Sequence, residues 1–196
     1  MRKLIVSTIM SLDGYVAGPG GNPMVLPMDA SFDEFNLDEL KAADVVLLGG
    51  TSYGMFSGFW PGVAGDASFS ATNREFSRLY NAVDKVVISD RATPPPAGHL
   101  WANNTRIVKR AKAREEVVKL KEGDGKGIVT FASGTLWNDL LAQGLVDELH
   151  LMIGALFLRD GTPAVGAGAP PLRRIDVRTF DNSDNVLARY AVQNNA

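Results

Sequence analysis

The stretch Gly127–Ile153 constrains the fold more than any other part of the chain, because it contains in order a strand, a turn, a helix and a second strand. Residues 128–131 are apolar and mostly β-branched, which is typical of a buried strand. Residues 132–135 then form a turn with almost no side-chain bulk, and Gly144 stands where a helix often ends in a left-handed residue. Such a turn leaves backbone amides free at the positive end of a helix dipole, which suits a phosphate.

The same alternation of strands and helices runs through about the first 150 residues. Further strands are expected at Leu4–Met10, Val45–Leu48, Asp84–Ser89 and Asn104–Val108, and helices at about Ser31–Ala42, Thr72–Asn81 and Ala111–Glu122. Leu172–Phe180 and Val186–Val192, joined by turn-forming residues, have the pattern of a hairpin. This order predicts one α/β domain over residues 1–196, with a mainly parallel central sheet between two helical layers and a C-terminal antiparallel hairpin.

Two segments have less regular patterns. Gly18–Pro27, rich in Gly and Pro, is expected to be a loop, either a mobile lid or a surface excursion. Ala155–Leu158 is a candidate strand end inside the Gly- and Pro-rich segment 154–171.

The composition excludes several classes of function. A formal net charge of -2 with no basic block gives no electrostatic footprint for nucleic acid. The absence of Cys excludes disulfides and thiol catalysis, and only His99 and His150 are available, so no metal site is expected. The N-terminal apolar run lacks the features of a signal peptide, and no apolar stretch reaches about 18 residues. We therefore expect a soluble cytoplasmic protein without a membrane partner.

Small polar turns follow three of the expected strands, at 49–52 (Gly-Gly-Thr-Ser), 89–91 (Ser-Asp-Arg) and 132–135. The carboxyl ends of parallel strands gather on one edge of a sheet, which is where open α/β sheets bind ligands. Three such turns favour an anionic, nucleotide-like ligand at that edge. The alternative is that the turns are only structural, with Ser133 or Thr135 serving as a helix cap.

Four segments together resemble the dihydrofolate reductase-like family: LDGYVAG (12–18), VVLLGGTSYGMFSGFWP (45–61), VVISDR (86–91) and ASGTLWNDLLAQGLVDELHLMIGALFLRDGTP (132–163). Within that family they are most similar to stand-alone relatives of the riboflavin-biosynthesis reductase domain, the C-terminal domain of RibD. The match covers nearly the whole chain in order, and G-T-L…L…G-L-V-D-E-L is its most specific part. The resemblance implies a dihydrofolate reductase-like fold and NADPH as a bound hydride donor.

The resemblance also implies which residues hold the cofactor. One helix start would meet the phosphates with Gly49, Gly50, Thr51 and Ser52. A second helix start would hold the pyrophosphate with Ala132, Ser133, Gly134, Thr135 and Leu136. The adenosine 2′-phosphate would be flanked by Ser89 and Arg91, and the nicotinamide lined by Thr8, Ile9, Val16 and Ala17.

The chain departs from the family pattern at two places. Gly50 stands where the family usually has Arg, and a lost charge-assisted phosphate contact is worth roughly 1.5–3 kcal/mol, or one to two decades in affinity. This leaves Arg91 as the main support for NADPH over NADH, unless Arg91 is simply a solvated loop residue. Ile153-Gly154 replaces a His-Pro pair that is frequent in the reductase domain, so the riboflavin intermediate is not inferred as the substrate.

Hydride transfer needs the cofactor, a dry pocket and a group that donates a proton or orients the substrate. Asp29 is the first candidate, because Leu26-Pro27-Met28-Asp29 resembles the L-P-x-D entry of dihydrofolate reductases, and Asp13 is the second. Both also have structural interpretations, as a helix cap and as part of a turn. Phe32, Phe35, Phe56 and Trp60 are candidates to wall a planar substrate, although aromatic residues at this spacing are commonly core.

Two functions remain after these arguments. The first is an NADPH-dependent reductase of a small planar heterocycle, and the second is a nucleotide-binding protein of the same fold without reductase activity. Glu148 and His150 are interpreted as interface or sheet-edge residues, and the apolar run Leu149–Leu158 as a surface that pairs with a second copy in a homodimer.

Overall fold

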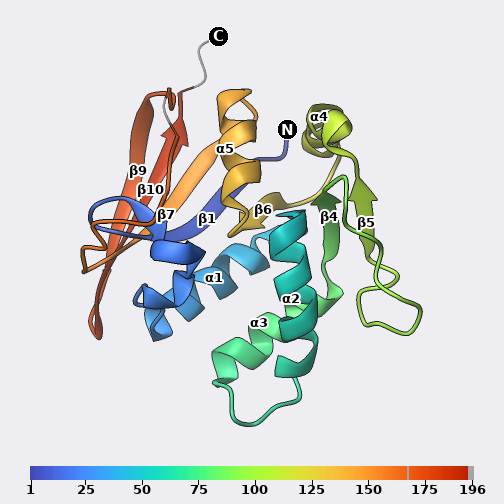
Figure 1. Cartoon of the computed structure of the whole chain (residues 1–196), viewed down its shortest axis with the longest axis horizontal. Helices are drawn as coiled ribbons and strands as arrows, with labels where there is room; N and C mark the ends of the chain where they lie inside the picture. Colours follow the sequence, from blue (N-terminus) through green and yellow to red (C-terminus); the bar gives the residue numbers. More distant parts are fainter. Residues whose placement is uncertain (167, 194–196) are drawn as a thin grey trace.

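Within residues 1–166 and 168–193, which the computed structural model describes, eight strands form one sheet in the order β5-β4-β3-β6-β1-β7-β10-β9 (Figure 1). The strands are β1 (Leu4–Ser11), β3 (Ala43–Gly49), β4 (Asp84–Ile88), β5 (Thr105–Val108), β6 (Gly127–Phe131), β7 (Glu148–Gly154), β9 (Leu172–Phe180) and β10 (Ser183–Val192). The six strands from β5 to β7 are parallel, while β10 is antiparallel to both β7 and β9.

The order of the strands places a topological switch beside β6. After β1 the chain crosses to β3 and continues outward to β4 and β5, and it then returns to place β6 between β3 and β1. From β6 it crosses β1 to reach β7 on the other side. Open α/β sheets form their ligand crevice at the carboxyl ends of strands where the order reverses in this way.

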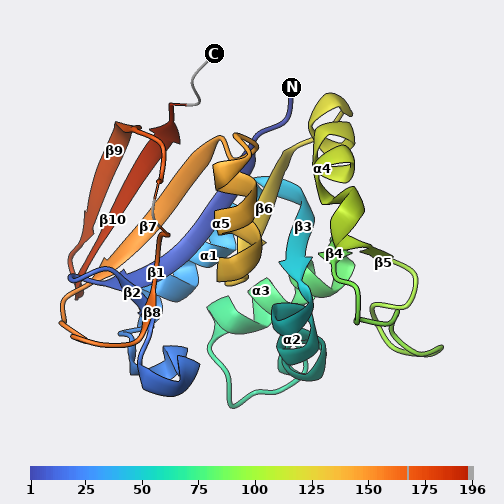
Figure 2. The same cartoon turned by 45° about the horizontal axis from the view of Figure 1, so that its top comes forward.

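Helices cover both faces of the sheet and make the three predicted layers (Figure 2). The helices are α1 (Ala30–Lys41), α2 (Gly50–Val63), α3 (Ala71–Ala82), α4 (Ala113–Glu122) and α5 (Gly134–Ala142), with 3₁₀ turns η1 (Pro19–Gly21), η2 (Pro23–Val25) and η3 (Arg110–Lys112). Because side chains alternate along a strand, β3 directs Val45 and Leu47 into the core beneath α4 and α5. It directs Val46 and Leu48 into the core beneath α1, α2 and α3.

The predicted elements are confirmed with small shifts at their ends, and Gly144 has the left-handed φ of 69° expected after α5. The aromatic segment after β3 is helical throughout as α2, which continues past Pro61 to Val63. The predicted strand end at 155–158 is wrong. The next strand, β8 (Thr162–Pro163), begins four positions after residue 158 and pairs with β2 (Tyr15–Ala17) in a separate small sheet.

The interpretation of Glu148 and His150 as interface or sheet-edge residues is also wrong, and the part of the run Leu149–Leu158 that lies in β7 has no free edge for a second copy. Both edges of β7 are occupied within the chain, by β1 along residues 148–154 and by β10 along residues 148–153. Glu148 and His150 are buried under α1. The alternation of charged and apolar residues in β7 resembles an edge strand in sequence, but here it reflects a polar layer inside the protein.

Candidate functional site

The candidate site lies at the carboxyl edge of β4, β3 and β6, which are adjacent in the sheet. α2 begins at Gly50 directly after β3, and α5 begins at Gly134 directly beyond the turn that follows β6. The prediction that three small polar turns gather on one edge is therefore confirmed for 49–52, 89–91 and 132–135.

The N-termini of α2 and α5 differ from those of α1 and α3, which begin after loops. α1 and α3 are capped by side chains, since Asp29 accepts from two amides of α1 and Ser70 Oγ accepts from the Asn73 amide. Gly49 and Ser133, at the N-caps of α2 and α5, make no side-chain cap hydrogen bond. α4 also lacks one, but it continues from η3. The amides of α2 and α5 are thus left without a capping side chain at the ligand edge, as an anion site requires.

Hydrogen bonds join the two helix starts to each other. Ser133 Oγ accepts from the Gly49 amide at 3.0 Å, and the Ser133 amide donates to Ser52 Oγ at 3.0 Å. The Ser133 hydroxyl therefore bonds to the backbone at the end of β3. It does not cap α5, as the alternative interpretation would require. Ala132 and Ser133 both have left-handed backbones, with φ of 49° and 54°. Non-glycine residues in this region cost of order 1–3 kcal/mol each and gather at functional sites.

Gly50, the departure from the family pattern, has a local physical reason. A Cβ at position 50 would lie 2.6 Å from Ser89 Oγ and 3.0 Å from Ser89 Cβ. Ser89 is buried, and its hydroxyl accepts from the amides of Arg91 and Ala92 at 3.2 and 3.0 Å, which fixes it in place. An Arg at position 50 does not fit unless Ser89 moves. Arg91 itself has an exposed side chain at the same edge.

The four residues proposed for the nicotinamide lie on β1 and β2. Ile9 and Ala17 are buried, Thr8 is nearly so, and Val16 is half-buried. Ile9 belongs to an apolar cluster beneath α1 that also contains Phe35. A Cβ at Gly161, which precedes β8, would lie 2.0 Å from the Ala17 carbonyl, so only glycine allows this close approach.

Asp29 is confirmed as the N-cap of α1, which was the structural interpretation. Its Oδ1 accepts from the amides of Ser31 and Phe32 and from the Ser31 hydroxyl, and its Oδ2 accepts from the Ser183 hydroxyl at 2.5 Å. Burial raises the pKa of the Asp29 carboxyl, but these hydrogen bonds outweigh burial and the net pKa lies below the ordinary value. Ser183, 154 residues away, was not found from the sequence, because no local pattern indicates such a contact.

Asp13 holds two loops together. Its carboxylate accepts from the Ser11 hydroxyl at 2.6 Å and from the amides of Leu158 and Arg159 at 3.1 and 2.7 Å. The Ser11 hydrogen bond is the largest cause that lowers the pKa of Asp13, and the two amides add to it. The carboxylate thereby supports the backbone of Arg159, which has a left-handed φ of 66°.

The four aromatic candidates are divided between two clusters. Phe32 and Phe35 pack beneath α1 with Ile9, and Phe35 is buried. Phe56 and Trp60 of α2 instead belong to an aromatic cluster over the other half of the same face. The structure does not bring the four together as one wall. Phe32, Phe56 and Trp60 are partly exposed, and of these only Phe32 lies in the first turn of α1.

Two further observations limit the chemistry of the described residues. Across residues 1–166 and 168–193, no three His, Asp or Glu side chains come together in a way that could hold a metal ion. None of the helices in that part of the chain has the length and apolarity needed to cross a membrane.

Comparisons with known proteins agree with this architecture. Residues 2–185 match the family model described as RibD C-terminal domain. Protein YyaP of Bacillus subtilis (strain 168), itself uncharacterized, is 27% identical over 164 residues, which are 83% of this chain and 79% of that protein.

Two solved structures share the fold at low sequence identity. A pyrimidine reductase-like protein of Corynebacterium diphtheriae has a TM-score of 0.63 at 14% identity, over 99% of this chain and 93% of the other. Dihydrofolate reductase of Enterococcus faecalis, solved with NADP(H), has a TM-score of 0.59 at 13% identity, over 98% and 97%.

Proposed function

Because the chain belongs to the RibD C-terminal domain family, we propose that it is an NADPH-dependent reductase that transfers hydride to a small planar heterocycle of pteridine or pyrimidine type. The observation that carries the proposal is the pair of helix starts without capping side chains, joined through Ser52 and Ser133 at the switch point of the sheet. Two amide clusters so joined suit a pyrophosphate, whose two charged groups are linked at a fixed spacing.

The residues at this edge fit a nicotinamide dinucleotide. The amides at the start of α2 (Gly50, Thr51, Ser52) and of α5 (Gly134, Thr135, Leu136) would hold its phosphates, and Ser89 with Arg91 would meet a 2′-phosphate. Gly50 brings the start of α2 against Ser89, so close that a Cβ at position 50 would lie 2.6 Å from the Ser89 hydroxyl. Thr8 and Ile9 of β1 with Val16 and Ala17 of β2 would line the nicotinamide, and the cofactor supplies the hydride.

In this proposal Asp29 orients the substrate rather than protonating it. A carboxylate whose pKa lies below the ordinary value is ionised at neutral pH, so it accepts hydrogen bonds from the ring N–H or amino groups of a heterocycle. Phe32, in the first turn of α1, would pack against the ring. The roles of Asp13 and of Phe35, Phe56 and Trp60 are then structural support for this arrangement.

A second candidate is a nucleotide-binding protein of the same fold without reductase activity. The specific observation in its favour is that both carboxylate candidates, Asp29 and Asp13, already accept hydrogen bonds on each oxygen. Such a protein would bind the cofactor but would not consume it with any acceptor.

The proposal places the protein in the cytoplasm as a homodimer. With both edges of β7 occupied, β9 is the better surface, because it is an edge strand whose Leu172, Ile175 and Val177 are 40%, 43% and 51% exposed. Long exposed edge strands commonly pair with another chain. A sedimentation mass equal to one chain would refute the dimer.

The experiment that tests the proposal follows NADPH oxidation in the presence of dihydropterins and aminopyrimidines. We expect turnover with at least one acceptor, with Arg91→Ala raising the KM for NADPH by roughly tenfold to a hundredfold while leaving NADH unaffected. Arg78→Ala, which replaces an exposed arginine of α3 that pairs with Glu75 of the same helix, is the matched control. Cofactor binding without turnover on any acceptor would favour the second candidate.

A further inference from the structure

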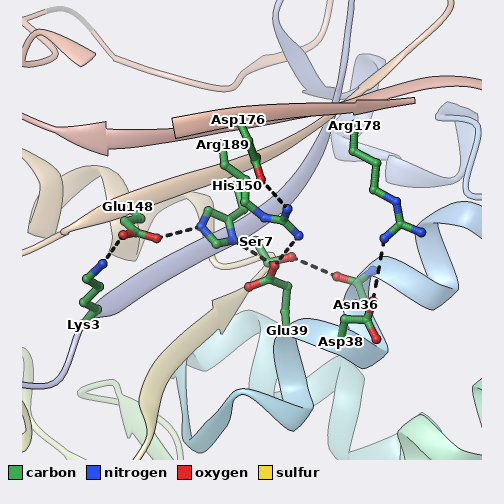
Figure 3. A network of polar contacts seen from close by, with 10 residues as sticks. All are labelled: Lys3, Ser7, Asn36, Asp38, Glu39, Glu148, His150, Asp176, Arg178 and Arg189. Carbon is green, nitrogen blue, oxygen red and sulfur yellow. Dashed lines mark hydrogen bonds and ion pairs between the residues drawn. The ribbon is translucent and has the colours of Figure 1, made fainter. Parts of the chain in front are cut away.

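A polar network lies between α1 and the sheet (Figure 3). Its centre is a row of side chains on neighbouring strands, because Ser7 of β1 and Arg189 of β10 are both in register with His150 of β7. Side chains in register point to the same face, so the whole row faces α1. The helix meets it with polar residues: Ser7 Oγ donates to Asn36 Oδ1 at 3.0 Å, and Glu39 contacts both His150 and Arg189.

Two residues further along the strands, the same face becomes apolar. Ile9, Met152 and Leu187 form the next row in register, and they pack with Phe35 of α1 in one buried cluster. α1 therefore meets a polar row with its C-terminal half and an apolar row with its N-terminal half. Sliding the helix by one turn would press the Glu39 carboxylate against apolar side chains, so the network sets the position of α1 along the sheet.

His150 is contacted by a carboxylate at each ring nitrogen. Its Nε2 lies 2.9 Å from Glu148 Oε2 in a hydrogen bond, and its Nδ1 lies 2.8 Å from Glu39 Oε1 as an ion-pair contact, with poor hydrogen-bond direction. Both carboxylates and the imidazole are buried. A neutral imidazole carries one N–H, so one nitrogen would present its lone pair to a carboxylate oxygen. Only the doubly protonated imidazolium has a proton for each contact.

Two buried carboxylates contact His150, and a cation lies beyond each of them. The carboxylates in contact are Glu148 on its own strand and Glu39 on α1, while Asp176 on β9 lies beyond Arg189. The cations are Lys3, 2.5 Å from Glu148, and Arg189, 3.4 Å from Glu39 and 3.2 Å from Asp176. Each of the two carboxylates in contact with His150 thus meets one cation, Lys3 or Arg189, on one side and the His150 ring on the other.

The hydrogen bond to Glu148 raises the pKa of Lys3, and Arg173 of β9 is close enough to oppose that rise. A further pair of charges joins β9 to α1. Arg178 of β9 lies 3.9 Å from Asp38 of α1, and Ser7 of β1 and Asn36 of α1 are uncharged. Burial raises the pKa of the Glu148 carboxyl, but hydrogen bonds from Lys3 and His150 outweigh it, and its net pKa lies below the ordinary value. Glu148 therefore remains a carboxylate that a proton on His150 can neutralise.

We propose that Glu39, His150 and Glu148 form a proton-dependent positioning device, in which the imidazolium holds α1 in place on the sheet and loss of one proton loosens it. This inference rests on the proposed function in one respect, because the residues assigned to the substrate are Asp29, which caps α1, and Phe32 in its first turn. Loosening α1 then weakens the substrate side of the site and leaves the amides assigned to the cofactor phosphates, at α2 and α5, unchanged. His150 acts through α1 and is a positioning residue.

The protonation state is testable directly, because the chain has only two histidines. His99 is the matched internal control: its Nδ1 accepts from the Trp101 amide at 3.1 Å, so that nitrogen carries no proton. We expect ring ¹⁵N spectra at pH 7, assigned with His99→Gln, to show both nitrogens of His150 protonated and one nitrogen of His99 bare. A bare nitrogen on His150 at pH 7 would overturn the proposal.

Hydrogen exchange tests the consequence for α1 without any ligand. We expect exchange of α1 amides to become about tenfold faster at high pH than at low pH, after correction for the intrinsic rates, because a neutral His150 leaves a lone pair facing a carboxylate. In His150→Gln it should be fast at every pH. In Glu39→Gln it should stay slow at every pH, because an amide at position 39 can donate to the bare Nδ1 of a neutral His150.

The control helix is α5, on the opposite face of the sheet, whose amides should not change in these variants. Equal changes in α1 and α5, or wild-type behaviour of both variants, would overturn the device. These results do not depend on the proposed function, which fails separately if NADPH does not bind. If NADPH binds, His150→Gln should raise the KM for the heterocycle about tenfold and leave the dissociation constant of NADPH unchanged.

Discussion

Lys85 offers the sharpest test of how burial governs the stability of this fold. The side chain lies in β4 and is 1% exposed. Its Nζ donates to the Val83 carbonyl at 2.8 Å and sits 4.6 Å from the centroid of Trp101 and 5.5 Å from that of Tyr80. Burial lowers the pKa of Lys85 from 10.5 to about 7, and the charge of Asp84 offsets only part of this.

The size of the effect follows from linkage. The pKa of Lys85 is about 7 in the folded state, compared with 10.5 for an exposed lysine. This difference means that keeping Lys85 charged lowers the free energy of unfolding by about 5 kcal/mol. The contacts with the two aromatic rings offset up to about 2 kcal/mol of it. The unfolded chain binds the proton more tightly, so the cost is fully present below pH 7 and disappears as pH rises towards 10.5. Lys85 therefore lowers the stability of the folded protein most in acid and neutral solution.

We expect Lys85→Met to stabilise the protein by about 2–3 kcal/mol at pH 6.5 and by progressively less towards pH 10. The Val83 carbonyl keeps a partner, because Asn104 Nδ2 donates to it at 3.0 Å. Urea unfolding followed by far-UV circular dichroism at several pH values measures the difference, with the exposed Lys119→Met as control. A constant destabilisation at every pH would refute the reasoning and show that the ring contacts outweigh burial.

Other substitutions test the site. Gly50→Ala should destabilise, because its Cβ would clash with Ser89, whereas Gly54→Ala, in open space within the same helix, should stabilise by about 0.5–1 kcal/mol in urea unfolding. Asp29→Ser should keep the helix cap and most of the stability but lose heterocycle binding. Asp29→Ala should lose heterocycle binding and also lower the free energy of unfolding by about 1 kcal/mol. Equal heterocycle binding by the wild type and Asp29→Ser would contradict the role assigned to Asp29. Hydrogen bonds lower the pKa of Asp13 in the folded state. Its ionised carboxylate therefore stabilises the folded protein at pH values above the ordinary pKa of an aspartate, and this stabilisation is lost as the pH falls through the lower pKa of the folded state. Asp13→Asn should remove that acid-dependent part of the unfolding profile.

The sequence predicted elements well where one local pattern decides the structure. Continuous apolar runs such as Val45–Leu48 are characteristic of central parallel strands, and the small residues 132–135 indicated the turn before α5. Asp29 illustrates the same point, because an Asp before an apolar helical pattern predicts a cap whatever else it does.

The sequence could not predict features that depend on partners far away in the chain. β7 alternates charged and apolar residues as an edge strand does, and only the return of β10 shows that it is central. β8 has two residues and no pattern of its own, and the Ser183–Asp29 contact spans 154 positions. The clash that excludes a side chain at Gly50 depends equally on where β4 places Ser89.

The most direct test of the central claim is an equilibrium titration with NADPH and NADH of the wild-type protein and Gly134→Asp. Position 134 is in open space, and an acidic residue in the first turn of α5 stabilises the helix, so folding is preserved. The added carboxylate would repel a pyrophosphate held there. We expect tight NADPH binding by the wild type and at least about tenfold weaker binding by the variant. Binding of neither cofactor, or equal binding by both proteins, would contradict the account.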